Sequence, residues 1–369
     1  MKNKEQQNLE PQYLEDLLSI LTDDCDVVDN WYRAREFAEE KLMEKMCRMN
    51  AQGKFTYPLH IIVEGSSPLM CAMIREIILR AHYYDFNEET GENASLITVH
   101  CDNEETTKNI LLSTPFLGDY LRYCWGADGK EPLYFLDVLV EVRTEIDEDK
   151  NAVVLTDEDL DAFCDGRNVA HTIDTKRARL ANQAYNMGRV LDNLPDINSA
   201  DVKMYNIPRT DFEAKLLSEN VGKKWEDADV MNKLSNVFCV DTFDLRIKML
   251  ERSAFETEEY KDITLLSKKE FETLTCKVEE NILALSKCEH SRWVAEKLLL
   301  GFKPWSPEDH YKSSRMFGKE KKDDYRGRKK SEGFHYDICS YRDLCRCDPG
   351  NRKYDTFLVL SMLNIDKKK

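Results

Sequence analysis

The chain has 369 residues, of which 42% are hydrophobic, and it carries a formal net charge of −16. This length predicts two compact domains with connecting segments, and the apolar content excludes a globally disordered chain. The acidic balance argues against general binding to nucleic acid or to an anionic membrane surface, because both need a basic face. No apolar run approaches the roughly 20 residues of a membrane span, so we expect no membrane insertion.

The twelve cysteines are scattered along the chain, and the first residues form no apolar signal. Both features favour reduced thiols and a cytoplasmic protein. Four potential metal ligands gather near the end of the sequence, at His335, Cys339, Cys345 and Cys347. Their C-x5-C-x-C spacing differs from the paired C-x2-C of zinc sites, so we predict no metal site.

Residues 1–55 are predicted to form a helical N-terminal segment, with helices between residues 11 and 50 and a break at Asp23–Asp24. Apolar residues recur there at helical spacing. They form two stripes: Leu14, Leu17, Leu18 and Leu21, then Trp31, Ala34, Phe37, Ala38, Leu42 and Met46. The pattern indicates a helical cap or a partner-binding helix pair, and it carries no chemistry.

Residues 56–255 show the pattern of an α/β domain. Apolar runs predict strands at 59–63, 96–99, 133–142, 152–155 and 202–205, with helical stretches at 175–191 and 212–217. After the first run, Ser67 suits a helix N-cap and Pro68 the first helical position. This order predicts a doubly wound parallel sheet. The layout resembles the Rossmann-like nucleotide-binding domain of Trk-type potassium-uptake regulators.

The turn after the first strand is a candidate cofactor site. It holds Gly65, Ser66 and Ser67, and Asp102 closes the second strand, where an acid would hold a ribose hydroxyl. Ser67 can hydrogen-bond a phosphate, whereas Pro68 removes one backbone donor. Only one glycine of a G-x-G-x-x-G fingerprint is present. Two interpretations stay open: a nucleotide or NAD(P) bound at the Gly65 turn, and a plain α/β scaffold without a cofactor.

Residues 235–249 resemble the connector of bacterial proteins that join such a domain to a ryanodine-receptor repeat domain. In this likeness a short turn with an acid leads into a helix that ends in a basic residue. Arg246 and Lys248 would either face a ligand or form a solvated helix face, and the charge pattern favours the solvated face.

A long helix is predicted from near Lys277 to Gly301, where glycine tolerates the left-handed turn of a helix end. Its core face comprises Val278, Ile282, Leu285 and Leu299. One polar row comprises His290, Trp293 and Lys297, and a second comprises Glu289, Arg292 and Glu296. Periodicity alone indicates a core Trp293, a half-buried His290 and a solvated Glu–Arg row.

The same helix carries a family resemblance. The segment Glu289-His290-x-Arg292-Trp293-x-x-Glu296-Lys297-x-x-x-Gly301-Phe302 resembles the opening helix of the ryanodine-receptor repeat domain. Three later motifs follow in the family's order: His335-Tyr336-Asp337, Tyr341-Arg342-Asp343-Leu344 and Lys353-Tyr354-Asp355. The sequence departs from the family at Phe302, where Trp is favoured, at residues 306–309, which lack a Gly-led turn, and in a long basic connection. The resemblance implies a mainly helical domain over residues 256–369.

The basic connection has nine Lys or Arg residues and three acids between His310 and Lys330, which gives a local charge of +6. Tyr311, Phe317 and Tyr325 are interleaved with these charges. Two interpretations stay open. The stretch is either a mobile, solvated loop or a segment that grips a phosphorylated ligand by charge and an aromatic face.

The sequence contains no catalytic constellation, and the resemblance implies a non-catalytic cytosolic sensor. Its C-terminal domain would bind a small anionic ligand, a nucleotide or a nucleotide second messenger. Each ligand-binding residue has an expected role: His290 donates to the ligand, Trp293 stacks on a base or walls the pocket, Arg292 and Lys297 meet phosphate or orient the acids, and Tyr336 and Tyr354 close the site.

Two alternatives to the sensor stay open. One is an enzyme that depends on NAD(P) or another nucleotide at the Gly65 turn, and the other is a protein-interaction scaffold. We also expect a homo-oligomer or a protein partner. Bacterial proteins with this pairing of domains resemble parts of signalling or anti-phage systems.

Overall fold

The computed structural model describes residues 25–42, 59–83, 86–114, 117–125, 135–146, 149, 152–167, 177–182, 185–186, 225, 228, 230–249, 280–347 and 351–366. The chain divides into two compact units, each assembled from separate stretches. The sheet unit takes residues 18–170 and 290–349, and the helical unit takes residues 1–17, 171–289 and 350–369. The predicted domain boundaries near residues 56 and 256 fall outside the described residues and stay predictions.

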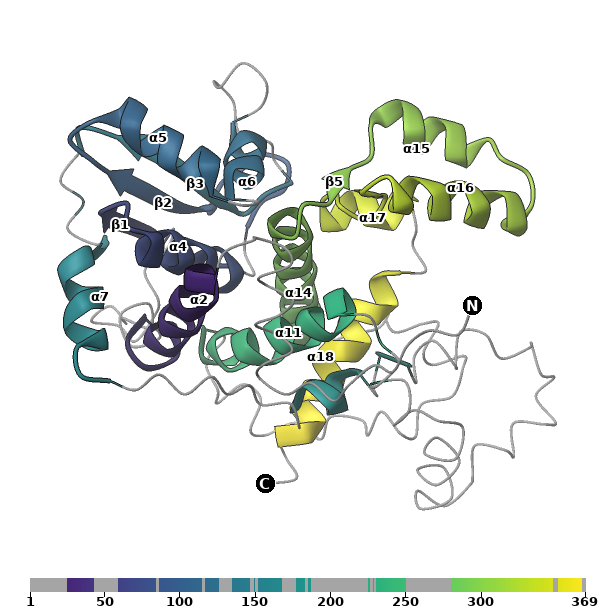
Figure 1. The fold of residues 1–369 in the computed structure, drawn as a ribbon. Helices are drawn as coiled ribbons and strands as arrows, with labels where there is room; N and C mark the ends of the chain where they lie inside the picture. Colours follow the sequence, from purple (N-terminus) through teal and green to yellow (C-terminus); the bar gives the residue numbers. More distant parts are fainter. Residues whose placement is uncertain are drawn as a thin grey trace. The chain divides into compact units, whose positions relative to one another are not determined.

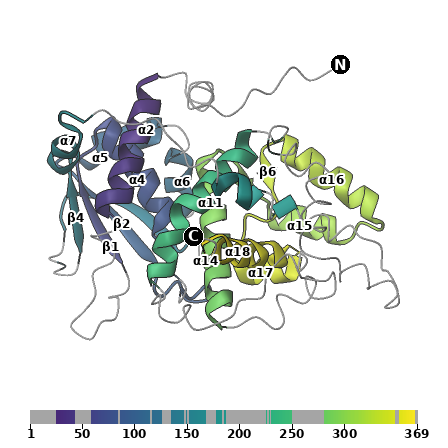
Figure 2. The same ribbon diagram turned by 90° about the horizontal axis from the view of Figure 1, so that it is seen from below.

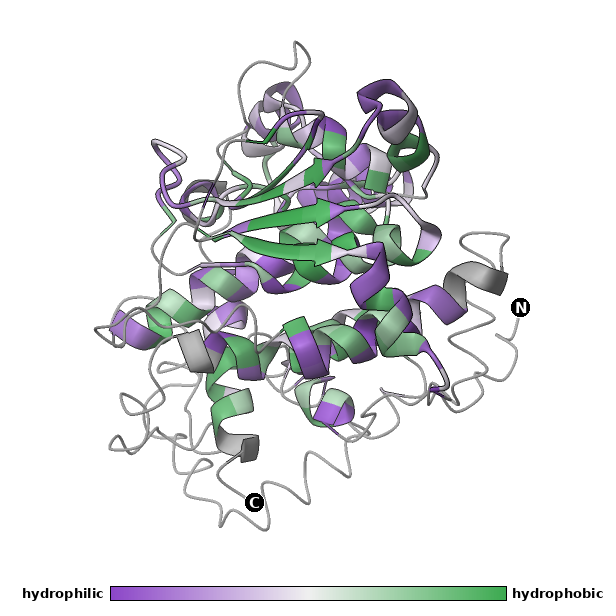
Figure 3. Ribbon diagram, turned by 90° about the vertical axis from the view of Figure 1, so that its left-hand side faces the viewer, coloured by the Kyte–Doolittle hydropathy of each residue, from purple (hydrophilic) through white to green (hydrophobic). Residues whose placement is uncertain are grey.

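The centre of the sheet unit is a four-stranded parallel sheet. Its strands are β1 (His60–Glu64), β2 (Ser95–His100), β3 (Val138–Arg143) and β4 (Val153–Thr156), in the spatial order β3-β2-β1-β4. The strands are hydrophobic along most of their length (Figure 3). Their fully buried residues are Ile61, Val63, Ile97, Val99, Val138, Val140 and Leu155. The predicted α/β class and the first four strands are therefore confirmed.

Some predicted elements of this region cannot be compared with the structure. The predicted strand at 202–205 and the helix at 212–217 lie outside the described residues. Residues 133 and 134, the start of the predicted third strand, also lie outside them, and β3 itself begins at Val138.

Helices leave the strands at the turns that the sequence predicts. α4 (Pro68–Arg80) follows β1, and the Ser67 hydroxyl accepts a hydrogen bond from the Met70 backbone N at 3.0 Å. Ser67 is therefore the N-cap and Pro68 the first helical residue, as predicted. α5 (Glu104–Ser113) and α6 (Leu117–Cys124) lie between β2 and β3 in the chain, and α7 (Asp157–Cys164) follows β4.

The N-terminal helix belongs to the same unit. α2 (Cys25–Phe37) continues into one π-helical turn, η1 (Ala38–Leu42), and lies beside α4 in Figures 1 and 2. The predicted apolar stripe is confirmed where it is described, because these residues are all buried: Trp31, Ala34, Phe37, Ala38 and Leu42. The earlier leucine stripe and Met46 lie outside the described residues.

The C-terminal part of the sheet unit is helical. α14 (Glu280–Leu299) leads into β5 (Lys303–Pro304), α15 (Pro307–Ser314), α16 (Lys319–Ser331), β6 (Phe334–His335) and α17 (Tyr341–Cys347). α15 and α16 lie side by side (Figure 1). Strands β5 and β6 pair in parallel, and β6 contacts α16. The interpretation of residues 310–330 as a mobile loop is therefore wrong. Ser306 caps α15, and the Lys, Arg and Glu residues of α16 are good helix formers.

α14 ends as the sequence predicts. Gly301 has a φ of +83°. The Phe302 N–H donates to the Lys297 carbonyl at 2.9 Å, and the Gly301 N–H donates to the Leu298 carbonyl at 3.0 Å. These two bonds form a Schellman motif, in which glycine is favoured because the left-handed residue has no Cβ.

The helical unit contains α11 (Val230–Met249), the first half of α14 and α18 (Arg352–Asp366). The predicted turn within residues 235–249 is wrong, because this stretch lies inside one continuous helix. Leu234, Phe238 and Leu245 are buried at spacings of four and seven, which is typical of a helix face. Within the described residues, no helix combines the length and the apolar character needed to cross a membrane.

Candidate functional site

The second polar row of α14 is buried, which corrects the prediction of a solvated face. Glu289, Arg292 and Glu296 keep at most 1% of their surface exposed. In the helical unit, Glu289 forms an ion pair with Arg246, which was also predicted to be solvated and is 2% exposed. Arg246 donates a further hydrogen bond to the Cys239 carbonyl at 3.1 Å. These charges tolerate burial because each one has a charged partner.

Glu296 holds the two cations that were expected to meet ligand phosphate. Its carboxylate accepts from Arg292 Nη1 at 2.6 Å and from Lys297 Nζ at 2.7 Å. The three side chains are at most 8% exposed. A ligand phosphate would compete with Glu296 for both cations, so the geometry agrees better with their alternative role, which is to orient an acid.

The other row of α14 contributes to a connected group of aromatic rings. His290 is 2% exposed, and its Nε2 lies 2.9 Å from the Cys339 carbonyl oxygen. The Trp293 ring stacks on His290 at 6.2 Å and meets His335 edge-on at 5.0 Å. The His335 and Tyr336 rings stack at 5.7 Å with an angle of 8°. The Trp293 ring thus lies between two histidine rings, an arrangement that agrees with its expected role as a side chain that lines the site.

The inner face of α16 carries a stripe of cations. Lys322, Arg326 and Lys329 are partly buried and recur at intervals of four and three residues, whereas the exposed positions of this helix mix both signs of charge. Lys329 is paired with Asp309, with 3.0 Å between Nζ and Oδ1. The Lys322 side chain has no ion-pair or hydrogen-bond partner among the residues that the structure describes. The partly buried face of α16 therefore carries one positive charge, that of Lys322, without a charged partner among the described residues.

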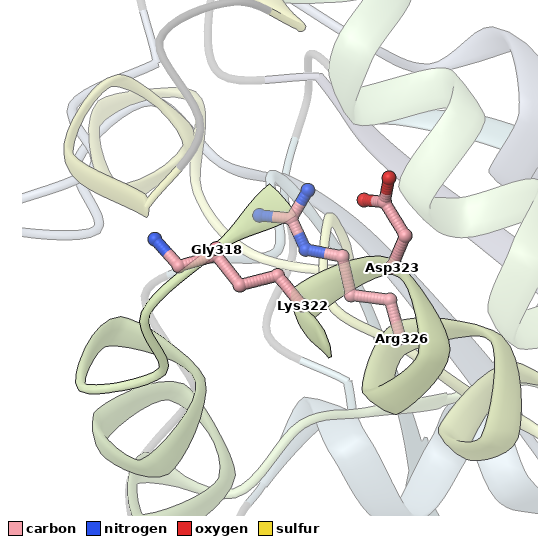
Figure 4. A pocket seen from close by; sticks show the side chains of 4 residues that line it. All are labelled: Gly318, Lys322, Asp323 and Arg326. Carbon is pink, nitrogen blue, oxygen red and sulfur yellow. The ribbon is translucent and has the colours of Figure 1, made fainter. Parts of the chain in front are cut away.

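Beside this stripe is an open pocket of about 330 Å³, lined by Gly318, Lys322, Asp323 and Arg326. In Figure 4 the Arg326 guanidinium lies between the Lys322 ammonium and the Asp323 carboxylate. The guanidinium also covers the Tyr336 ring at 4.0 Å, and its Nη1 lies 3.3 Å from the Tyr336 hydroxyl. Arg326 therefore connects the pocket to the aromatic group.

Hydrogen bonds shift the pKa of one carboxyl on α15. Burial raises the pKa of Asp309, but hydrogen bonds from Tyr325, Lys329 and Ser306 outweigh this effect and bring the pKa to about 2. Asp309 therefore stays ionised and keeps Lys329 engaged at any physiological pH. Lys322 and Arg326 remain as the cations of the stripe that line the pocket.

The imidazole of His335 is held neutral. Burial lowers its pKa to about 3, and the charges of Lys330, Lys297 and Arg326 act in the same direction. The Asp337 backbone N–H donates to His335 Nδ1 at 3.3 Å. Because Nδ1 accepts this bond, the ring proton is assigned to Nε2.

A carboxylate of the chain itself occupies the turn after β1. Gly65 has a φ of +143°, and a Cβ at this position would overlap the carboxylate of Asp157. The Ser67 hydroxyl donates to Asp157 Oδ1 at 2.6 Å. Ser66 is partly buried in the same turn, and Asp102 is exposed after β2. A cofactor phosphate at this turn would have to displace Asp157, because two anions would otherwise share the site.

The predicted ligand-binding residues fall in both units. The sheet unit brings together His290, Trp293, Lys297 and Tyr336, with Arg292 on Glu296. Tyr354 belongs to the helical unit, where its ring lies 5.3 Å from that of Tyr185, and its closing role stays a prediction.

The basic stretch was predicted as one possible grip for a phosphorylated ligand, but Lys322 and Arg326 were not singled out within it, and His335 was considered only as a metal ligand. The i, i+4 spacing of Lys322 and Arg326 would have placed them on one face, had the basic stretch been read as a helix. The role of His335 depends on contacts that no local pattern shows.

In the described part of the chain, no group of three or more His, Cys, Asp or Glu residues is placed to hold a metal ion. Comparison of the chain with protein-family models, with characterised proteins and with solved structures finds no significant match. Function is therefore inferred from the residues of this chain.

Proposed function

We propose that this protein is a non-catalytic cytoplasmic sensor that binds a small anionic ligand, a nucleotide or nucleotide second messenger, at the pocket on α16. In this proposal a Rossmann-like α/β domain is followed by a helical domain of the ryanodine-receptor repeat type, and the α/β domain relays binding. Support comes from the motifs around Trp293 and Tyr336. It also comes from the strand order β3-β2-β1-β4, which matches the first four strands of a Rossmann sheet.

The observation that carries the proposal is the uncompensated cation in the pocket. Lys322 lines the pocket without a charged partner among the described residues, and Arg326 lies beside it. Lysine and arginine bind phosphate through charge-assisted hydrogen bonds, which are roughly twice as strong as neutral ones. The pocket is lined by two cations and one carboxylate, that of Asp323, which leaves a net positive charge that suits a small anion. The exposed face of α16 mixes both signs of charge and suits a long polyanion less well.

Arg326 adds a flat surface to this charge. One face of the guanidinium lies on the Tyr336 ring at 4.0 Å, and the group also lines the pocket. Guanidinium planes stack on nucleobases as well as pairing with phosphate. A nucleotide supplies both a flat ring and an anionic group, which is why it fits this pocket better than a simple inorganic anion.

The NAD(P)-dependent alternative has weaker support. Its expected phosphate position at the Gly65 turn is filled by the Asp157 carboxylate, which the Ser67 hydroxyl already binds. The predicted ribose acid, Asp102, is exposed after β2. A dinucleotide would need this turn to rearrange before its pyrophosphate could approach the N-terminus of α4.

The proposal is tested by thermal denaturation with a panel of nucleotides, on the wild type, Lys322→Ala and Lys321→Ala. Lys321 is the matched control because it is exposed on the same helix and does not line the pocket. A ligand at 100 times its Kd stabilises the folded state by about 2.7 kcal/mol. We expect this gain in the wild type and in Lys321→Ala, and its loss in Lys322→Ala. A panel in which no nucleotide stabilises the wild type would overturn the proposal.

A further inference from the structure

The ring of His335 is fixed by its neighbours. Tyr336 stacks on it at 5.7 Å, Trp293 meets it edge-on at 5.0 Å, and Phe302 lies at 6.3 Å with an angle of 85°. The backbone is also held, because His335 pairs with Pro304 in the β5–β6 sheet. A ring constrained in this way has its nitrogen atoms positioned before any ligand arrives.

One nitrogen of this ring is used and the other is not. The Asp337 backbone N–H donates to Nδ1 at 3.3 Å, so Nε2 carries the proton. Within the described ranges, no atom accepts a hydrogen bond from Nε2, and 14% of the side chain remains exposed. The depressed pKa of His335 keeps the ring neutral across the physiological range. Nε2 is not among the buried polar atoms that lack a partner, so it is open to solvent, and a donor held in a fixed ring at such a position is a candidate for use by a ligand.

The surroundings of His335 suit a flat, electron-rich group. Trp293, Phe302 and Tyr336 provide aromatic surface around it. The charges of Lys330, Lys297 and Arg326 act on the ring and would favour a ligand atom with negative partial charge. Carbonyl oxygens and unprotonated ring nitrogens of a nucleobase have both properties, because they accept hydrogen bonds at the edge of an aromatic plane.

Tyr336 links His335 to the pocket. Its ring stacks on His335 at 5.7 Å, and the Arg326 guanidinium that lines the pocket covers the same ring at 4.0 Å. Through these two contacts His335 lies one ring away from a residue that lines the pocket. A nucleotide whose phosphates meet Lys322 would reach His335 around the edge of the Tyr336 ring.

We infer that His335 reads the base of the bound nucleotide by donating a hydrogen bond from Nε2 to an acceptor on the edge of that base. The inference rests on the proposed function, and it assigns His335 as a specificity-determining residue rather than a part of the scaffold. It also gives the ligand a direction, with the phosphates at Lys322 and the base at His335.

The test measures equilibrium binding of the four common nucleoside triphosphates and of inorganic tripolyphosphate, which has the same charges without a base. The variants are His335→Phe, which removes the donor, His335→Gln, which keeps an N–H donor, and Lys322→Ala. In the wild type we expect one of the four nucleotides to bind at least about tenfold more tightly than the other three, a difference of about 1.4 kcal/mol. His335→Phe should abolish this preference among the bases and leave tripolyphosphate binding unchanged, and His335→Gln should retain most of the preference.

The results distinguish the reading role of His335 from the phosphate site at Lys322. If His335→Phe keeps the wild-type preference while Lys322→Ala weakens all ligands, the reading role of His335 is wrong and the phosphate site stands. If neither the nucleotides nor tripolyphosphate bind the wild type, or if Lys322→Ala binds them equally well, the proposed site is wrong, and the reading role is refuted with it. Circular dichroism checks the fold of each variant, and His335→Met, which also lacks the donor, replaces His335→Phe if that variant does not fold.

Discussion

Replacing Glu296 with glutamine removes the carboxylate that Arg292 and Lys297 share, at almost constant volume. The two ion pairs measure 2.6 and 2.7 Å, and Glu296 itself is fully buried. Without the carboxylate, two largely buried cations face a neutral amide. Breaking a buried pair by removing one partner costs about 3–5 kcal/mol. This is a large part of the 5–15 kcal/mol that typically stabilises a folded protein.

The change is measured by urea denaturation of Glu296→Gln and of a matched control, Glu104→Gln. Glu104 pairs with Lys108 on α5 with the same i, i+4 spacing as Arg292 and Glu296, but its side chain is 43% exposed. The control should lose less than about 1.5 kcal/mol, because an exposed helix pair contributes about 0.3–0.5 kcal/mol and the charge of Glu104 in the first turn of α5 adds about 0.3–1 kcal/mol. Glu296→Gln should shift the midpoint far more at an unchanged m value. A loss for Glu296→Gln as small as that of the control would refute the buried cluster and restore the solvated face.

Two further predictions concern stability. Gly65→Ala should destabilise the protein by about 1–3 kcal/mol through the backbone strain of its φ of +143° alone. The new Cβ would also clash with the Asp157 carboxylate, and adding Asp157→Ala should remove this clash but not the backbone strain. Thermal melts of the single and double variants check this, and full recovery in the double variant would contradict it. His335 has a folded pKa of about 3, below its usual 6.5, so the unfolded state binds the proton more readily and stability falls as the pH drops from 6.5 towards 3. At about 1.4 kcal/mol per pH unit, the wild type should lose about 2 kcal/mol of stability between pH 6.5 and 5 because of this group. The His335→Gln variant should lack this loss. Denaturation of both proteins at pH 6.5 and at pH 5 measures the loss of stability in each, and equal losses in the two proteins would show that His335 does not titrate in this way.

Local patterns predicted the parts of the fold that depend on neighbouring residues. Ser67 and Pro68 mark the start of α4 because an N-cap hydroxyl and a proline act within one helical turn. Gly301 marks the end of α14 because the left-handed residue of a Schellman motif favours glycine. The strands followed from apolar runs, since parallel strands that are covered on both faces are almost entirely hydrophobic.

Features that depend on distant residues were not predictable in this way. The charges of Glu289 and Arg246 looked like a solvated pattern, and only their pairing across 43 residues of sequence allows them to be buried. The Gly65 turn looked like a degenerate phosphate site, because its occupant, Asp157, lies 90 residues from Ser67 in the sequence. Neither interpretation of the basic stretch included a helix, because charge was given more weight than the helix propensity of lysine and arginine.

Two charge reversals one residue apart test whether the nucleotide binds at the Lys322 pocket. Lys322→Glu and Lys321→Glu change the net charge of α16 equally, but only Lys322 lines the pocket. Isothermal titration with the nucleotide that stabilises the wild type most should show Lys321→Glu binding within about threefold of wild type and Lys322→Glu binding at least about tenfold more weakly. Equal losses in both variants would mean that the nucleotide responds only to the overall charge of the helix, and that the pocket is not its binding site.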